Sequence, residues 1–105
     1  MKILVYGAGA VGGYIGAHLI ENGLDVTFLA RGGHLKNIVD KGLNIVLSNQ
    51  EKIVHPSYAT DSLATLKNVT FDVVIVAVKA WQVRESATEI LPYTSSSTLM
   101  ISVQN

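Results

Sequence analysis

Three glycines near the amino terminus, Gly7, Gly9 and Gly12, constrain the fold of this chain more than any other feature. They follow the apolar run 3–6, which is typical of a buried strand. They open the segment 10–21, in which small and apolar residues recur at helical spacing. The G-x-G-x-x-G spacing in this context predicts a strand, a tight turn and a helix.

The composition allows one small globular domain and argues against several classes of protein. A chain of 105 residues can bury one core but hardly two, and 49% hydrophobic residues is too apolar for a disordered chain. The eight basic and eight acidic side chains cancel, so no broad charged surface favours nucleic acid or an anionic membrane. No apolar run approaches the roughly 20 residues of a membrane span.

The amino-terminal residues and the absence of cysteine fit a cytoplasmic protein. Met1 and Lys2 lead directly into a four-residue apolar run, which is too short for the core of a signal peptide, so we expect Met1 to be the true start. The lack of cysteine excludes disulfides and thiolate metal sites and is compatible with a reducing compartment.

The rest of the chain alternates predicted strands and helices. Further strands are expected at residues 26–29, 73–78 and 99–103, with a polar-tipped hairpin formed by residues 43–47 and 52–54. Further helices are expected at 34–41, at 62–66 with Asp61 or Ser62 as cap, and at 81–91 with Val83, Ala87, Ile90 and Leu91 on the buried face and Pro92 as the stop. Because the strands are almost entirely apolar, we expect an α/β fold, a Rossmann-like, doubly wound, mainly parallel sheet over residues 1–105 with helices on both faces.

The glycine turn predicts a dinucleotide site. The first glycine permits the turn, the second lets the backbone approach a pyrophosphate, and the third lets the helix pack closely on the strand. Main-chain amides at the helix start would then face the phosphates. Gly13 and Gly16 are better explained as packing residues, and glycines that merely form a turn are the alternative. The residues expected at the pyrophosphate are Gly7, Ala8, Gly9, Ala10, Val11 and Gly12.

The end of the second predicted strand indicates which dinucleotide is bound. NAD-binding folds of this type normally place an acidic residue there to hold the ribose hydroxyls, whereas this chain has Leu29, Ala30 and Arg31. A guanidinium can grip a 2′-phosphate bidentately, so the cofactor expected is NADP(H). The alternative is a solvated turn arginine. His34 and Lys36 could assist at the adenosine end or be ordinary exposed helix residues.

Two further polar residues follow apolar strands at the expected ligand edge. Lys79 comes after the strand 73–78, which should lie beside the first strand, so its ammonium would face a phosphate, a ribose or a substrate anion, or else solvent. Asn105 follows the last strand, where its amide could bind a hydroxyl or carbonyl or simply belong to a loop. The histidines show no metal-like pairing and no Ser-His-Asp order is present, so a bound cofactor should carry the chemistry.

These stretches resemble the amino-terminal domain of the ketopantoate reductases (2-dehydropantoate 2-reductases). The resemblance rests on "KILVYGAGAVGGYIGAHL", "ARGGHL", "VIVAVKAWQV" and the final "QN". It implies NADPH-dependent reduction of a small 2-oxo acid, ketopantoate, to pantoate in pantothenate and coenzyme A biosynthesis. It also implies that Arg31 holds the 2′-phosphate, that Lys79 contacts the cofactor and lines the catalytic cleft, and that Asn105 contacts the nicotinamide ribose and the substrate.

The chain departs from that family in length. Ketopantoate reductases have a helical carboxyl-terminal substrate domain that supplies a lysine as general acid, and none of it is present in these 105 residues. We therefore expect a piece of a longer protein, made by design, by proteolysis or from a truncated reading frame. Such a piece would bind cofactor without turnover and could self-associate through an exposed face.

Three other functions remain open on the sequence alone. The chain could belong to another NADP-dependent 2-oxo or 3-hydroxy acid dehydrogenase, because the substrate pocket lies mainly outside it. It could be a regulatory nucleotide-binding domain such as those that gate potassium transport, although such domains generally carry an acidic ribose contact. It could also be a structural domain with no ligand.

Overall fold

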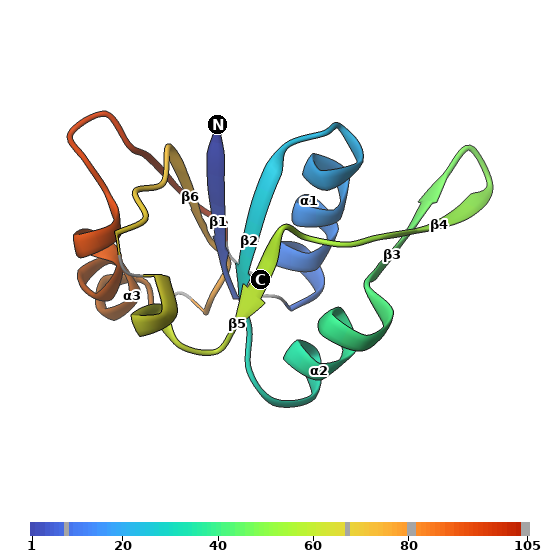
Figure 1. Ribbon diagram of the computed structural model, residues 1–105, viewed down its shortest axis with the longest axis horizontal. Helices are drawn as coiled ribbons and strands as arrows, with labels where there is room; N and C mark the ends of the chain where they lie inside the picture. Colours follow the sequence, from blue (N-terminus) through green and yellow to red (C-terminus); the bar gives the residue numbers. More distant parts are fainter. Residues whose placement is uncertain (8, 67, 80–81, 104–105) are drawn as a thin grey trace.

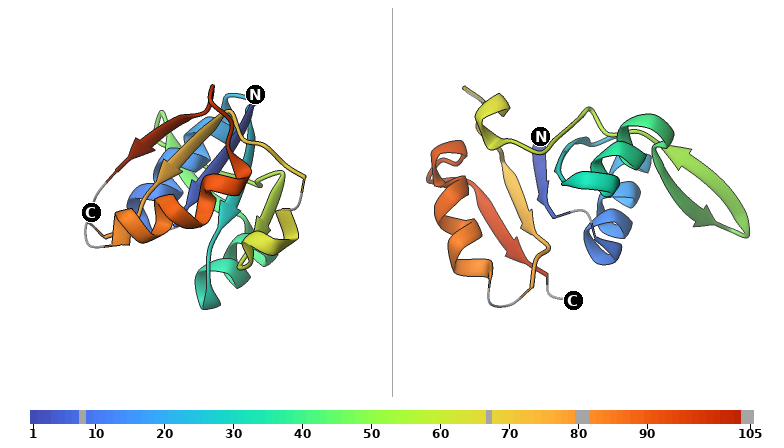
Figure 2. Two further views of the ribbon diagram at one scale, coloured as in Figure 1. Left: turned by 90° about the vertical axis from the view of Figure 1, so that its left-hand side faces the viewer. Right: turned by 90° about the horizontal axis from the view of Figure 1, so that it is seen from below.

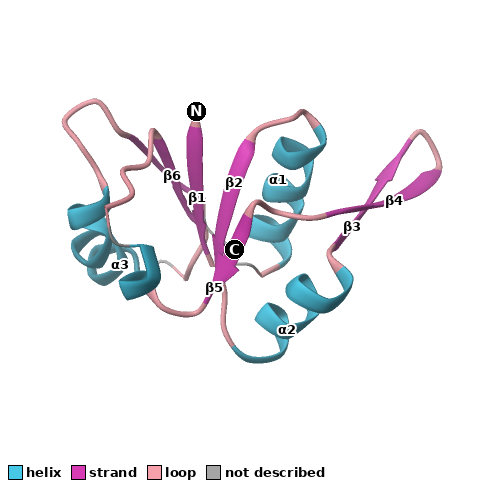
Figure 3. Ribbon diagram, viewed as in Figure 1, coloured by secondary structure: helices cyan, strands magenta, loops and turns pink. Residues whose placement is uncertain are grey.

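A five-stranded parallel sheet forms the centre of the chain in the computed structural model, which describes residues 1–7, 9–66, 68–79 and 82–103 (Figure 1, Figure 3). In spatial order the strands are β5 (Tyr58–Thr60), β2 (Asp25–Leu29), β1 (Lys2–Tyr6), β6 (Val73–Val76) and β7 (Leu99–Ser102). Every neighbouring pair is parallel. This order confirms the predicted Rossmann-like sheet, because the chain starts in the middle and winds outward in both directions.

Helices cover the two faces of this sheet, as predicted (Figure 2). Helices α1 (Ala10–Glu21) and α2 (Gly32–Lys41) lie on one face, and α3 (Val83–Ile90) lies on the other. The pleat of β1 separates two cores, since Ile3 and Val5 pack toward α1 and α2 whereas Leu4 and Tyr6 pack toward α3. Strand residues buried on both faces explain the nearly continuous apolar runs.

A two-stranded hairpin, β3 (Leu43–Leu47) and β4 (Gln50–Val54), projects from the helix-covered sheet (Figure 1). Its turn is two residues long, and Ser48 and Asn49 both have positive φ, at 50° and 66°. That geometry matches the twist of an antiparallel pair, so β4 begins two residues earlier than the sequence predicted.

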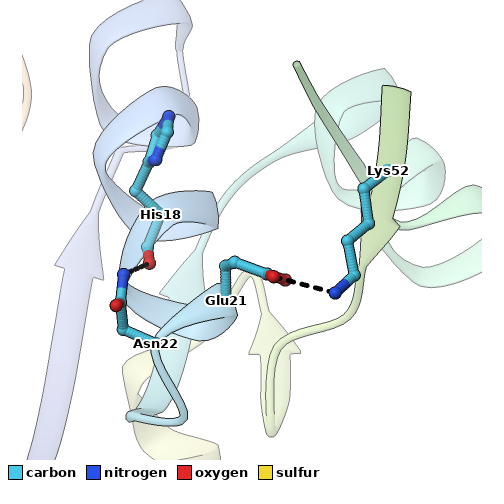
Figure 4. Close-up of polar contacts among 4 residues, drawn as sticks. All are labelled: His18, Glu21, Asn22 and Lys52. Carbon is cyan, nitrogen blue, oxygen red and sulfur yellow. Dashed lines mark hydrogen bonds and ion pairs between the residues drawn. The ribbon is translucent and has the colours of Figure 1, made fainter. Parts of the chain in front are cut away.

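Helix α1 ends as predicted and also anchors the hairpin (Figure 4). The Asn22 side chain donates a hydrogen bond to the His18 carbonyl at 2.7 Å, and Gly23 follows with φ +82°. Lys52 of β4 pairs with Glu21 of α1 at 2.8 Å. Because that pair is partly solvated, apolar packing near Ala17 contributes more to this contact than the ion pair does.

Several predicted boundaries were wrong. Strand β6 ends at Val76 rather than at residue 78, and α2 begins at Gly32 rather than at His34. The short segment β5 was not predicted at all, because three residues carry too little periodicity to be recognised. The expected helix at 62–66 is a 3₁₀ helix, Leu63–Leu66, and Ser62 directly precedes it: its carbonyl accepts the Thr65 amide at 3.2 Å, and its own amide donates to the Thr60 hydroxyl at 3.1 Å.

The last predicted helix and strand also differ from expectation. The α-helical part stops at Ile90, but Leu91–Tyr93 continues as a 3₁₀ helix that accommodates Pro92. Leu91 is 60% exposed, whereas Ser86 is buried in its place. Strand β7 lies at the sheet edge, and its residues Leu99, Met100 and Ile101 are exposed rather than shielded on both faces.

A partly buried hydrogen bond joins α3 to the central strand β1. Tyr6, the last residue of β1, is 8% exposed, and its hydroxyl donates to Glu89 Oε2 of α3 at 2.6 Å. Burial raises the pKa of Tyr6 above its ordinary value, and the hydrogen bond to Glu89 raises that pKa further. The folded state therefore holds the phenolic proton more tightly than the unfolded state does.

We expect Tyr6→Phe to lower the free energy of unfolding by about 1–2 kcal/mol near neutral pH, because Glu89 loses a charge-assisted donor. A raised pKa means that the contribution of Tyr6 is complete below 10.0 and is lost as the pH rises above that value. Urea unfolding at about pH 8 and about pH 11 should therefore show the difference between wild type and variant narrowing at the higher pH. A difference that stays constant would contradict this role for the hydroxyl.

Close packing of α1 on β2 gives a second expectation. A Cβ at Gly16 would lie 2.1 Å from Cζ of Phe28, which is fully buried and unable to yield. Gly16→Ala should therefore destabilise the fold by about 1–3 kcal/mol. The matched control is Gly33→Ala in α2, where a Cβ meets nothing within 4 Å and should be neutral or slightly stabilising. Thermal unfolding of both variants measures the contrast, and equal stabilities would refute the packing argument.

Candidate functional site

The carboxyl ends of β2, β1 and β6 meet at one edge of the sheet and enclose a cavity of about 290 Å³. Parallel strands bring the loops that follow them to the same edge, where ligands bind in doubly wound folds. The cavity is lined by Tyr6, Gly7, Leu29, Ala30, Arg31, His34, Val78, Gln82, Glu85, Ser86 and Glu89.

The glycine turn at this edge has the geometry that its motif requires. Gly7 has φ +99°, and its amide donates to the Leu29 carbonyl at 2.9 Å. A Cβ at Gly7 would lie 2.5 Å from the Ala77 carbonyl oxygen, and a Cβ at Gly12 would lie 2.1 Å from the Gly7 oxygen. Only glycine fits either position. Contact with a pyrophosphate stays a prediction, and Ala8 lies outside the described residues.

The start of α1 presents main-chain donors at the same turn. Gly9 is the N-cap, and within the described part of the chain no side chain caps this helix. Ala10 is exposed and Val11 is partly buried in the first turn, which contains no acidic residue. The first amides of a helix lack partners within it and carry its positive dipole end. This end of α1 can therefore accept an anion.

Arg31 stands where β2 passes into α2. It is the N-cap of that helix in extended conformation, it is exposed, and it lines the cavity together with His34. Its positive charge acts to lower the pKa of Tyr6, against the larger effects that raise it. The electric field of the guanidinium therefore reaches the Tyr6 hydroxyl, which belongs to a residue lining the same cavity. Lys36, also considered from the sequence, is exposed and is not among the lining residues.

The opposite wall belongs to α3 and the residue before it, and it was not predicted from the sequence. Gln82, Glu85, Ser86 and Glu89 line the cavity from this side. Their spacing of three and four places them on one helical face, which was the available signal. The local pattern does not show that α3 lies opposite α2, so the sequence alone does not indicate that this helical face borders the cavity.

Of the two residues predicted as catalytic, Lys79 is described by the structure and is not among the residues that line the cavity. Lys79 is exposed and lies three residues beyond the end of β6, and Val78 rather than Lys79 contributes to the lining. The Lys79 amide lies 3.4 Å from Gln82 Oε1, within the turn that leads into α3. Asn105 lies outside the described residues, so its role stays a prediction.

A second, more open hollow of about 490 Å³ lies beside the start of α1, against strand β3. Gly9, Ala10 and Gly13 contribute to it, so Gly13 lies at a surface hollow, whereas Gly16 packs against Phe28 as predicted. The rings of Tyr14 and His18 lie 4.5 Å apart at its border.

The described residues form neither a metal centre nor a membrane span. No group of three or more His, Asp or Glu side chains in residues 1–7, 9–66, 68–79 and 82–103 is arranged to hold a metal ion. Within the same ranges, none of the helices has the length and apolar character needed to cross a membrane.

Comparison with known proteins assigns the chain to a family. Residues 3–105 match the ketopantoate reductase PanE/ApbA family. The whole chain is 35% identical to the uncharacterised oxidoreductase YkpB of Bacillus subtilis, covering 33% of it, and 32% identical to the 2-dehydropantoate 2-reductase of Mesorhizobium japonicum, covering 32% of it.

A solved structure agrees. The PanE/ApbA family ketopantoate reductase from Ralstonia eutropha superposes on the whole chain with a TM-score of 0.84 at 30% identity, and the chain covers 34% of it. The chain thus spans about a third of the length of these relatives. It belongs to the ketopantoate reductase PanE/ApbA family of nicotinamide-dinucleotide-dependent oxidoreductases.

Proposed function

We propose that this chain is the cofactor-binding portion of an enzyme that reduces 2-dehydropantoate to pantoate with NADPH, a step toward pantothenate and coenzyme A. The observation that carries the proposal is the shared cavity of Gly7 and Arg31. Gly7 belongs to the turn that leads into the first amides of α1, so those amides and the Arg31 guanidinium lie at the same edge of the sheet, as a phosphorylated dinucleotide requires. Membership of the family supports the reaction class.

In this proposal the cavity holds the adenosine end of the cofactor. Its volume of about 290 Å³ is at the low end of the range for ligand pockets, so it suits part of a dinucleotide rather than all of it. Arg31 would bind the 2′-phosphate, and the first amides of α1 would bind the pyrophosphate. The remainder of the cofactor would extend past Gly7 along the edge toward β6.

The bound cofactor would supply a hydride to the keto carbon of the substrate. Lys79, on the exposed loop after β6, would stabilise negative charge on the cofactor or the substrate, and Asn105 would contact the nicotinamide ribose and the substrate. A proton must also reach the developing alkoxide. We infer that its donor lies outside these 105 residues, because the family relatives are about three times as long.

A related 2-oxo acid is the second candidate substrate. One relative at 35% identity, YkpB, is known only as an oxidoreductase, so family membership does not fix the substrate. In this proposal the cavity holds the cofactor, so its residues do not distinguish ketopantoate from another 2-oxo acid.

The cofactor preference can be tested at Arg31. Arg31→Ala should weaken NADPH binding about 10- to 100-fold, which is the range for losing a charge-assisted phosphate contact. Binding of NADH should change by less than about threefold, because NADH has no 2′-phosphate. Fluorescence titration of both cofactors measures the contrast, with Lys36→Ala in the same helix as a matched loss of positive charge outside the cavity. Equal losses for both cofactors would refute the assignment.

The division of labour can be tested with the purified 105-residue chain. We expect it to bind NADPH and to reduce 2-dehydropantoate at a negligible rate, because hydride transfer without a positioned acid and without exclusion of water is slow. Titration and an absorbance assay of NADPH oxidation measure the two properties separately. Reduction at a normal enzymatic rate would show that the chain contains its own proton donor.

A further inference from the structure

We propose that Glu89 is a specificity-determining residue of the cofactor site: its carboxylate, held by Tyr6, limits how strongly Arg31 favours a dinucleotide that carries a 2′-phosphate. The inference rests on the proposed function, because it requires the adenosine end of the cofactor to occupy the cavity beside Gly7 and Arg31. From the sequence, the only charges expected at this site are positive, and Glu89 adds a negative charge to it.

The residues that line the cavity carry charges of both signs. Arg31 contributes the one guanidinium among the described lining residues, while Glu85 and Glu89 contribute two carboxylates from α3 on the opposite wall. With His34 neutral, the lining has a net negative formal charge. A 2′-phosphate would therefore be attracted from the α2 side and repelled from the α3 side, and the balance depends on how firmly each charge is held.

Glu89 is held more firmly than an ordinary surface glutamate. Its Oε2 accepts the Tyr6 hydroxyl at 2.6 Å, a short charge-assisted hydrogen bond. Tyr6 is itself immobilised, because it pairs with Leu29 of β2 on one side and Val76 of β6 on the other. Glu89 is exposed on α3, but the hydrogen bond from Tyr6 holds one of its carboxylate oxygens beside the cavity.

The Tyr6 hydroxyl lies within the electric field of both walls. The negative charge of Glu89 adds to the rise in the pKa of Tyr6, and the positive charge of Arg31 opposes it. Among the described residues no ion pair joins Arg31 to Glu85 or Glu89. The opposing charges therefore remain separated across the cavity, and a phosphate bound at Arg31 would also experience the field of Glu89.

The expected effect is moderate. Arg31 would contact the 2′-phosphate directly, whereas Glu89 would act on it from the other wall through solvent that partly screens its charge. The net interaction with the phosphate is therefore attractive, and the repulsion from Glu89 only lowers the preference for the phosphorylated cofactor. Removing the charge of Glu89 should therefore strengthen binding of the phosphorylated cofactor by about three- to tenfold.

Glu89→Gln is the test, because the glutamine carbonyl can still accept the Tyr6 hydroxyl while the charge is lost. The affinity for NADPH should rise about three- to tenfold, and the affinity for NADH should change by less than about twofold. Binding of 2′,5′-ADP should strengthen relative to 5′-AMP, because these probes differ only in the 2′-phosphate. Glu51→Gln on strand β4 makes the same charge change far from the cavity, and it should leave both ratios unaltered.

Two further measurements separate charge from structure. At about 1 M salt, where the Debye length falls to about 3 Å, the difference between wild type and Glu89→Gln should shrink, which a purely structural role would not produce. Glu89→Lys should raise the preference for NADPH beyond that of the glutamine variant. Normal binding with unchanged cofactor ratios in both variants would overturn the inference and leave the proposed function standing. Failure of the wild-type chain to bind either dinucleotide would overturn both.

Discussion

Contact between backbones at the turn after β1 is the constraint on which the rest of the structure depends. The start of α1 lies so close to the turn that a Cβ on Gly12 would nearly coincide with the Gly7 oxygen, at 2.1 Å, and would press on Ala77 at 3.0 Å. A side chain on Gly7 would meet the Ala77 carbonyl. Without side chains between them, β1, α1 and the segment after β6 are held at backbone distance. The helix amides therefore reach the carboxyl edge of the sheet, and the cavity beside them has fixed walls.

The sheet order then determines which side chains share that cavity. Because β1 lies between β2 and β6, the helices that follow these two strands stand on opposite faces and lean over the same edge. One contributes Arg31 and the other contributes Glu89. Tyr6, at the end of the strand between them, has a hydroxyl whose pKa is influenced by both charges. If the proposed site binds a dinucleotide, its selectivity would be a balance between charges on two sides of the cavity rather than a property of one motif.

The parts of the site that follow from local sequence could be predicted, and the parts that follow from topology could not. Gly7 and Gly12 are recognisable because the turn chemistry is contained within six residues, and Arg31 because it lies two residues after the end of a predicted strand. The acidic wall requires knowing that α3 stands opposite α2, which no local pattern encodes. Lys79 follows β6 at the carboxyl edge of the sheet, as the sequence predicts, but the strand ends at Val76 rather than at residue 78 and the Lys79 side chain is exposed on the turn that follows. Contact of Lys79 with a cofactor stays a prediction.

Cofactor recognition and substrate choice are physically separable in this architecture. Backbone donors and edge charges recognise phosphates and are independent of the acid being reduced, so a cavity of this kind can serve several 2-oxo acid reductases. The outer edge of the sheet differs from its centre. Strand β7 exposes Leu99 and Ile101, at 57% and 40%, whereas the central strands are buried. An apolar strand is stable beside β6 without such sealing because its hydrogen bonds to that neighbour are already made. The described residues therefore combine a cavity at the carboxyl edge with an exposed outer strand, and in the proposed function the features that select a substrate need not follow from those that select the cofactor.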